Sequence, residues 1–181
     1  PYNLESNDEN ELCEGLNWTL KRGLLAREYT LYIPGKVDAH IWWLFDKRKY
    51  AMLRETLTRC LKSYDANERN EKGCTTLMGA AYWGDVEVVR LLCEREDIDV
   101  NASVEGEAAL HFAAKAGQLE CAQILTEVSN VDVNVATDCD MSPLHFACQC
   151  GHLDMVIYLV GRGADINARG PVGLTPLDFA I

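Results

Sequence analysis

The feature that most constrains this chain is an internal repeat with a period of 33 or 34 residues. Four short segments share one pattern of glycine, small and apolar residues, and they begin at Gly73, Gly106, Asp140 and Gly173. Sequences that repeat at this interval fold as stacked units, because one unit alone cannot bury its apolar face. The sequence therefore predicts a stack of similar units rather than a single globular core.

Two further landmarks follow the same period. A second glycine closes each of the first three segments, at Gly84, Gly117 and Gly151. An acidic residue and an asparagine recur farther along each unit, as Asp99-Val-Asn101, Asp132-Val-Asn134 and Asp165-Ile-Asn167. Three landmarks with one period are hard to obtain by chance, so they define the repeating unit.

Each part of the unit predicts a local structure. The opening glycine predicts a turn with positive φ. The residues after it predict a helix start, because a hydroxyl side chain can cap free N–H groups and proline at the first helical position loses no hydrogen bond. The apolar spacing of residues 86–92 predicts a second, amphipathic helix. We expect each asparagine of the third landmark to bond within its own turn.

These patterns resemble the ankyrin repeat family over residues 70–181, through the Ser-Pro-Leu-His of 142–145, the Thr-Pro-Leu-Asp of 175–178 and the Gly-Ala-Asp-Ile-Asn-Ala of 163–168. The resemblance implies an all-α solenoid of helix-turn-helix units with β-hairpin-like tips. Three departures stand out. The first repeat has Thr-Thr-Leu-Met, the second has Ala108 and Ala109, and the third has Asp140 where the others have glycine.

The predicted organisation has six parts: a non-repeat N-terminal extension (1–38), a degenerate capping repeat (39–69), three ankyrin repeats (70–102, 103–136 and 137–169) and a truncated repeat (170–181). The extension could cover the flank of the first repeat or be the edge of a preceding domain. Residues 177–181 form half a repeat with an apolar face, so we expect at least one further repeat beyond Ile181.

The chain is acidic, with 28 acidic and 17 basic side chains and a net charge of -11. From Asn70 onward there are 17 acidic and 6 basic residues, so the repeats carry the whole excess. This balance opposes binding to nucleic acids and to anionic membrane surfaces.

The 8 cysteines are irregularly spaced and several lie in apolar helical patterns. We favour a reduced intracellular protein, cytoplasmic or nuclear, over a disulfide framework.

One cluster of residues invites a zinc-site interpretation. The repeat register opposes it, because the members would point outward from two helices and a turn instead of converging. The cluster comprises Cys139, His145, Cys148, Cys150 and His152.

Catalytic motifs are absent from the sequence, including phosphate-binding glycine loops, nucleophile elbows and metalloprotease signatures. His111 and His145 follow a leucine near a predicted helix start, and we interpret them as histidines that tie turns. The sequence therefore predicts neither an enzyme nor a cofactor.

The family resemblance implies a binding surface, because ankyrin tips and the exposed ends of the first helices line a concave groove that takes partner proteins. Tyr82 and Trp83 are either interface anchors or packing residues for the N-terminal extension or the first hairpin. The positions that the resemblance assigns to partner binding are Glu71, Lys72, Cys74, Tyr82, Trp83, Glu105, Glu107, Lys115, Asp138, Met141 and Gln149.

Acidic tips favour a partner with a basic segment, since opposite charges steer association. The alternative is that the acidic surface serves only solubility. Two functions follow: a non-catalytic scaffold or adaptor module, or a regulatory or substrate-docking segment of a larger protein such as a ubiquitin-ligase receptor, a kinase, a channel or a chromatin factor.

Overall fold

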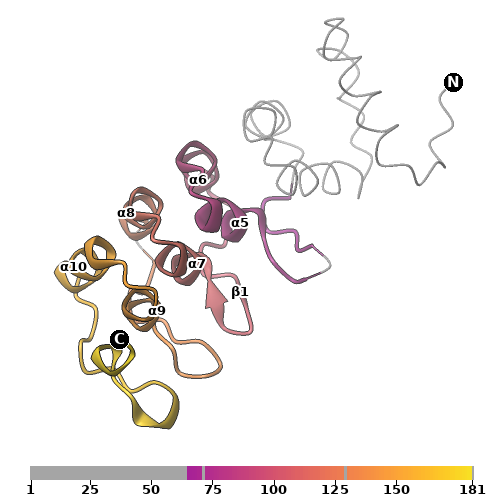
Figure 1. Cartoon of the computed structure of the whole chain (residues 1–181). Coiled ribbons are helices and arrows are strands. Elements are labelled where there is room, and N and C mark those ends of the chain that lie inside the picture. Colours follow the sequence, from indigo (N-terminus) through magenta and orange to yellow (C-terminus); the bar gives the residue numbers. More distant parts are fainter. Residues whose placement is uncertain (1–64, 71, 129, 181) are drawn as a thin grey trace, which may run out of the picture. The chain divides into compact units, whose positions relative to one another are not determined.

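The computed structural model describes residues 65–180 except 71 and 129, and there the chain forms successive helix pairs joined by loops (Figure 1). The first helices of the pairs are α5 (Thr76–Trp83), α7 (Ala109–Ala116) and α9 (Pro143–Gln149). The second helices are α6 (Val86–Cys93), α8 (Leu119–Glu127) and α10 (Leu153–Gly161). A hairpin of β1 (Ser103–Val104) and β2 (Glu107–Ala108) precedes α7, and two 3₁₀ helices, η1 (Pro171–Gly173) and η2 (Pro176–Phe179), end the described chain.

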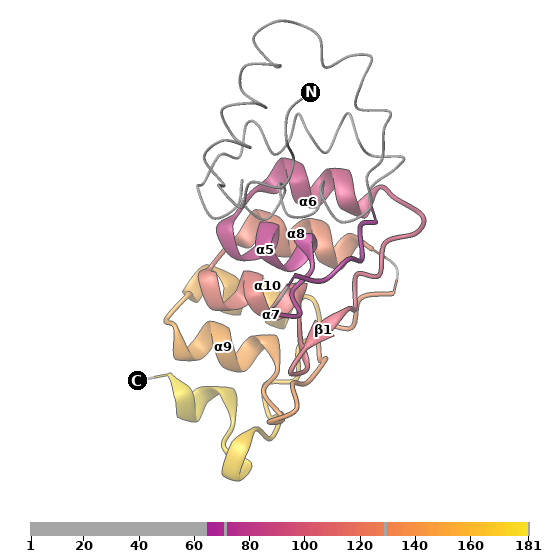
Figure 2. The same ribbon diagram turned by 90° about the vertical axis from the view of Figure 1, so that its right-hand side faces the viewer.

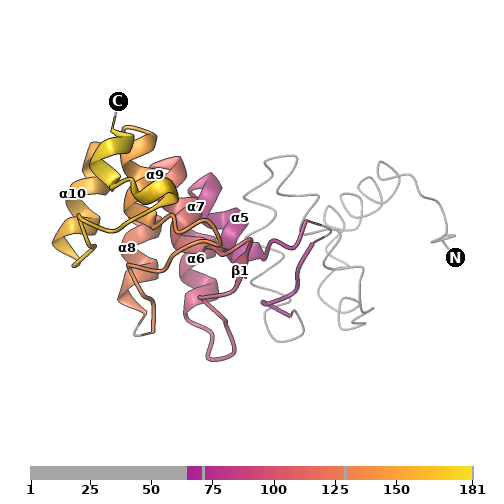
Figure 3. The ribbon, with the colours of Figure 1, turned by 90° about the horizontal axis from the view of Figure 1, so that it is seen from below.

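The helices lie in two layers. Contacts run from α5 to α7 to α9 in one layer, and from α6 to α8 to α10 in the other (Figure 3). We call α5, α7 and α9 the inner helices and α6, α8 and α10 the outer helices. The predicted all-α stack of helix pairs with hairpin-like tips is thus confirmed. None of the helices described is long and apolar enough to cross a membrane.

Small side chains let the inner helices pack closely. Ala80, Ala81, Ala113, Ala114 and Ala147 are each completely buried. Each inner helix also buries a leucine, at Leu77, Leu110 and Leu144, and each outer helix buries one at Leu92, Leu125 and Leu159. Because the same small and large positions recur in each unit, each helix pair packs on the next in the same way.

The helix starts differ from the prediction. Among the helices of residues 65–180, only Thr75 caps by hydroxyl, accepting the Met78 N–H at 3.4 Å. The recurring bond is the reverse one, in which the backbone N–H of the cap residue donates to a side chain three residues later. Ala108 donates to His111 Nδ1 at 3.0 Å, and Thr175 donates to Asp178 Oδ2 at 2.7 Å. This bond explains why α7 forms although Ala108 has no hydroxyl.

Two glycines are required by close contacts between neighbouring units. Gly106 has φ 76°, and a Cβ there would lie 2.4 Å from the backbone nitrogen of Asp138 in the next tip. Gly117 has φ 69°, and a Cβ there would lie 2.8 Å from the His152 ring. The glycine landmarks of the sequence therefore serve the stacking of units as well as their turns.

The asparagines of the third landmark do not bond within their own turns, so that prediction was wrong. The aspartate two residues earlier does so: Asp132 Oδ1 accepts the Asn134 N–H at 2.8 Å. The Asn134 side chain reaches the next unit instead, donating to the Gly163 carbonyl at 3.2 Å and accepting the Asp165 N–H at 2.7 Å.

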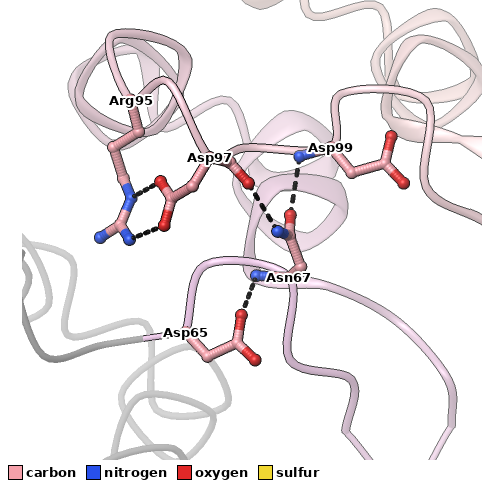
Figure 4. A network of polar contacts seen from close by, with 5 residues as sticks. All are labelled: Asp65, Asn67, Arg95, Asp97 and Asp99. Carbon is pink, nitrogen blue, oxygen red and sulfur yellow. Dashed lines mark hydrogen bonds and ion pairs between the residues drawn. The ribbon is translucent and has the colours of Figure 1, made fainter.

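The same connection occurs two units earlier along the stack (Figure 4). The Asn67 side chain donates to the Asp97 carbonyl at 2.7 Å and accepts the Asp99 N–H at 2.7 Å, while Asp65 Oδ1 accepts the Asn67 N–H. Arg95 holds the Asp97 carboxylate from the other side. An amide side chain that both donates and accepts suits this role, because a loop offers it one carbonyl and one N–H.

Several predictions lie outside the described residues. They are the N-terminal extension (1–38), all of the capping repeat (39–69) except its last five residues, and any repeat beyond Ile181.

Replacing Asn134 by alanine removes two hydrogen bonds between units. We expect Asn134→Ala to lower the free energy of unfolding by about 1–3 kcal/mol in urea denaturation. Asn167→Ala is the matched control, because Asn167 holds the same position but its side chain makes no bond to another unit within the described chain. Equal losses in the two variants would contradict a role for Asn134 between units.

Asp140 occupies a glycine position and has φ 61°, in the left-handed region. Because a Cβ is strained there, we expect Asp140→Gly to raise the free energy of unfolding by about 1 kcal/mol. Asp138→Gly removes the same charge from an exposed residue of the same tip that does not have positive φ, so it should lower stability. Thermal unfolding of both variants measures the difference, and a stabilising Asp138→Gly would contradict the assignment of strain to Asp140.

Candidate functional site

The tips and the inner helices border one side of the stack, and we call this side the inner face (Figure 2). It carries most of the residues that the family resemblance assigns to partner binding. Those with exposed side chains are Lys72, Glu105 and Asp138 on the tips and Tyr82, Trp83, Lys115 and Gln149 on the inner helices. Cys74 and Glu107 are half-buried, and Glu71 lies outside the described residues.

Met141 differs from the other assigned residues because it is only 7% exposed. Its backbone N–H donates to Thr137 Oγ1 at 3.1 Å, and its carbonyl lies 3.2 Å from His111 Nε2. These two bonds place Met141 at the base of its tip, where its side chain packs inward. Met141 therefore contributes to the core and offers no surface to a partner.

Neighbouring tips also contact each other through their backbones. The Asp138 N–H donates to the Glu105 carbonyl at 3.3 Å, so the second and third tips lie side by side. Glu105, Asp138 and Asp140 are all exposed there, and none forms an ion pair with another described residue. The tips thus present uncompensated negative charge to solvent.

An aromatic contact links the first two inner helices, α5 and α7. Tyr82 meets Trp83 at 5.0 Å and Phe112 of the next unit at 6.4 Å between ring centroids, both edge to face. Tyr82 and Trp83 remain 39% and 42% exposed. A partner can therefore reach these rings, as the interpretation of them as interface anchors requires.

In the second unit, Lys115 takes the position that Tyr82 has in the first. It contacts Phe146 of the third unit, as Tyr82 contacts Phe112 of the second. Its Nζ atom lies 5.2 Å from the centroid of the Phe146 ring and 3.4 Å from Glu107 Oε1. Sequence reasoning chose Lys115 and Glu107 but missed their pairing, and it missed the phenylalanines. The signal was present, since phenylalanine occupies the same place at 112, 146 and 179.

The two buried histidines tie turns, as predicted, and they also join units. His145 Nδ1 accepts the Ser142 N–H at 3.1 Å, so the ring proton resides on Nε2 and is donated to the Leu174 carbonyl at 3.3 Å. His111 uses Nδ1 in the same way, and its Nε2 reaches the carbonyls of Val135 and Met141. Each histidine thus connects its own helix start to the next tip.

The environment of His111 favours a neutral ring. Burial lowers the pKa of His111 to about 4, although hydrogen bonds with backbone groups of Met141, Val135 and Ala108 oppose this. The Phe146 ring meets the His111 ring edge to face at 5.8 Å. Because a protonated ring would lose its Nδ1 acceptor, protonation would break the bond from the Ala108 N–H at the start of α7, and the neutral ring preserves that bond.

The cluster considered for zinc has other contacts. His145 is bonded as described, and His152 Nε2 lies 3.2 Å from the Lys115 carbonyl. Across residues 65–180 the described histidines, cysteines and acids form no group that could hold a metal ion. The described cysteines are free thiols, and burial raises the pKa of Cys93 to about 11 and that of Cys121 to about 12. Such thiols pack as small apolar groups.

Comparisons with known proteins agree with this architecture. Two family models of ankyrin repeats match the chain, over residues 49–137 and residues 126–180. A 120-residue stretch, 66% of this chain, is 36% identical to alpha-latrocrustotoxin-Lt1a of Latrodectus tredecimguttatus. Stretches of 39 residues are 54% identical to the probable E3 ubiquitin-protein ligase XBOS33 of Oryza sativa subsp. japonica and to the NF-kappa-B inhibitor cactus of Drosophila melanogaster, and cover 22% and 21% of this chain. Each match spans 8% of the relative's own length.

Acid should weaken the stack through His111. In the unfolded chain this histidine takes up a proton near pH 6.5, whereas in the folded chain it does so only near pH 4. Between these values the unfolded state binds more protons, so stability falls as the pH falls, by up to about 3 kcal/mol.

His111→Met is the reference variant for this effect, because methionine fills the same position at Met78 and accepts the Thr75 N–H there. Urea denaturation at several pH values should show the parent losing stability relative to His111→Met between pH 6.5 and 4. A difference that does not change with pH would contradict the role of the neutral ring.

Proposed function

This chain belongs to the ankyrin repeat family, and on that premise we propose that it is a non-catalytic scaffold or adaptor module that binds a partner protein segment on its inner face. Ankyrin repeats serve as protein-protein interaction modules, so the general class of function follows from the family. The inner face as the binding surface, and the kind of segment it takes, are our proposal.

The observation that carries this proposal is the joint placement of exposed rings and uncompensated acids on one side of the stack. Tyr82 and Trp83 supply large apolar area at little cost in side-chain entropy, as interface anchors do. Glu105, Asp138 and Asp140 supply negative charge on neighbouring tips. A protein segment that carries both apolar and basic side chains is complementary to this combination.

A basic segment is favoured over a neutral one by the overall charge as well. The chain has a net charge of -11, and acidic residues outnumber basic ones in the repeats. Such a field speeds the encounter with a positively charged partner, and its effect weakens as salt screens it.

A second candidate is that the repeats dock substrates or regulators for a larger protein, such as a ubiquitin-ligase receptor, a kinase, a channel or a chromatin factor. The similarity to a probable E3 ubiquitin-protein ligase supports this candidate, although it extends over only 39 residues.

We also propose an intracellular location, cytoplasmic or nuclear. The free cysteines, two of which have strongly raised pKa values, support it.

The acidic tips can be tested with a hexa-lysine peptide as the probe. We expect the double variant Glu105→Gln/Asp138→Asn to bind the peptide about three- to tenfold more weakly than the parent and to show a smaller dependence on salt. Isothermal titration calorimetry from about 50 mM to about 500 mM NaCl measures both quantities.

The matched control is Glu120→Gln/Glu127→Gln, which removes two exposed negative charges from the outer helix α8. Its effect should be small if the tips form the binding surface. Equal weakening by both double variants would show that the peptide responds to net charge alone, and the assignment of the inner face would then fail.

A further inference from the structure

The contacts of Lys115 suggest a specific site on the inner face. Its ammonium group lies between the Glu107 carboxylate, 3.4 Å away, and the Phe146 ring, 5.2 Å from its centroid. A carboxylate beside an aromatic face is a general arrangement for holding a cation. In this structure the cation at that position is the ammonium group of Lys115, which belongs to the chain itself.

This combination occurs at one step of the described stack. Between the first two units, Tyr82 takes the position of Lys115 and Cys74 takes the position of Glu107. Between the last two, Gln149 and the buried Met141 take these positions. Within the units that the structure describes, the periodic frame therefore places a lysine, a glutamate and a phenylalanine together only where the second unit meets the third.

The site is held in place from several sides. Glu107 lies in β2, whose partner β1 pairs Val104 with it. His152 Nε2 lies 3.2 Å from the Lys115 carbonyl, and the His111 ring meets the Phe146 ring edge to face. In contrast, the Lys115 side chain is 43% exposed and can swing into solvent. The acid and the ring thus form a fixed frame. The Phe146 residue is 8% exposed with the ammonium group over its ring, so a partner reaches the ring face by displacing that group.

We propose that Glu107 and Phe146 form an arginine-binding site for a basic partner segment, and that Lys115 occupies this site until the partner displaces it. This inference rests on the proposed function, because it names the side chain that the inner face takes. A guanidinium group suits the site better than an ammonium group, since it is planar, stacks on rings and binds a carboxylate through two N–H groups. Exposed ion pairs such as that of Lys115 and Glu107 are weak, so a partner can replace one.

The proposal makes Lys115 a competitor of the partner. A hexa-arginine peptide serves as the probe, and calorimetric titration gives its affinity. We expect Lys115→Met to bind the peptide about three- to tenfold more tightly than Lys72→Met. The two variants remove the same charge from the same face, but Lys72 is exposed on the first tip and forms neither an ion pair with a described residue nor a contact with a described ring.

Two further measurements identify the site itself. Adding Glu107→Gln to Lys115→Met should abolish the gain in affinity, and Lys115→Met should prefer hexa-arginine to hexa-lysine. Circular dichroism confirms that each variant keeps its helices. If the parent binds hexa-arginine but Lys115→Met and Lys72→Met bind it equally tightly, the arginine site is wrong. The proposed function would still stand in that case. If neither the parent nor any variant binds hexa-arginine, the basic ligand is wrong and both proposals fail.

Discussion

Hydrogen bonds from side chains to the backbone of the next unit are the interaction on which the rest of this structure depends. His111 and His145 each accept a backbone N–H of their own helix start and donate to a carbonyl of the following tip. Asn67 and Asn134 each bond a carbonyl and an N–H of the following loop. Apolar packing alone would leave neighbouring units free to slide, whereas these directional bonds fix one register.

A fixed register gives the inner face its geometry. Because each tip is bonded to the tip or helix start before it, the exposed acids of neighbouring tips stay at constant positions relative to the rings of the inner helices. Tyr82 consequently meets Phe112, and Lys115 meets Phe146, by the same relation between units. The period that organises the core thus also organises the surface, and only the residue types that differ from unit to unit give each step its own chemistry.

The sequence predicted the period, the helix pairs and the exposed tips, because these follow from recurring glycines and from apolar spacing. It could not predict which side chain forms a hydrogen bond with which backbone group. The hydroxyl residues were expected to cap the helices, yet His111 and Asp178 accept the N–H of the cap residue. The asparagines were expected to bond locally, yet the side chains of Asn101 and Asn134 bond across units. Both errors have one cause. Such a side chain can bond to a group nearby in the sequence or to one in another unit, and its neighbours in space determine which partner it takes. One sequence does not show those neighbours.

The surface was predictable to a similar degree. Register placed most of the assigned residues on the inner face, but Met141 is buried at the base of its tip. The pairing of Lys115 with Glu107 and Phe146 joins residues from the helix of one unit, the tip before it and the helix of the next unit. Only the stack brings these three elements together, so the candidate arginine site became visible with the structure.

The central claim is that partners bind the inner face, and backbone amide shifts in NMR spectra test it most directly. Titration with hexa-arginine should shift the amide signals of Glu105, Glu107, Lys115 and Asp138. The signals of exposed residues on the outer helices, such as Glu87, Glu120 and Asp154, should stay in place. Shifts centred on the outer helices, with the tip signals unchanged, would contradict the account.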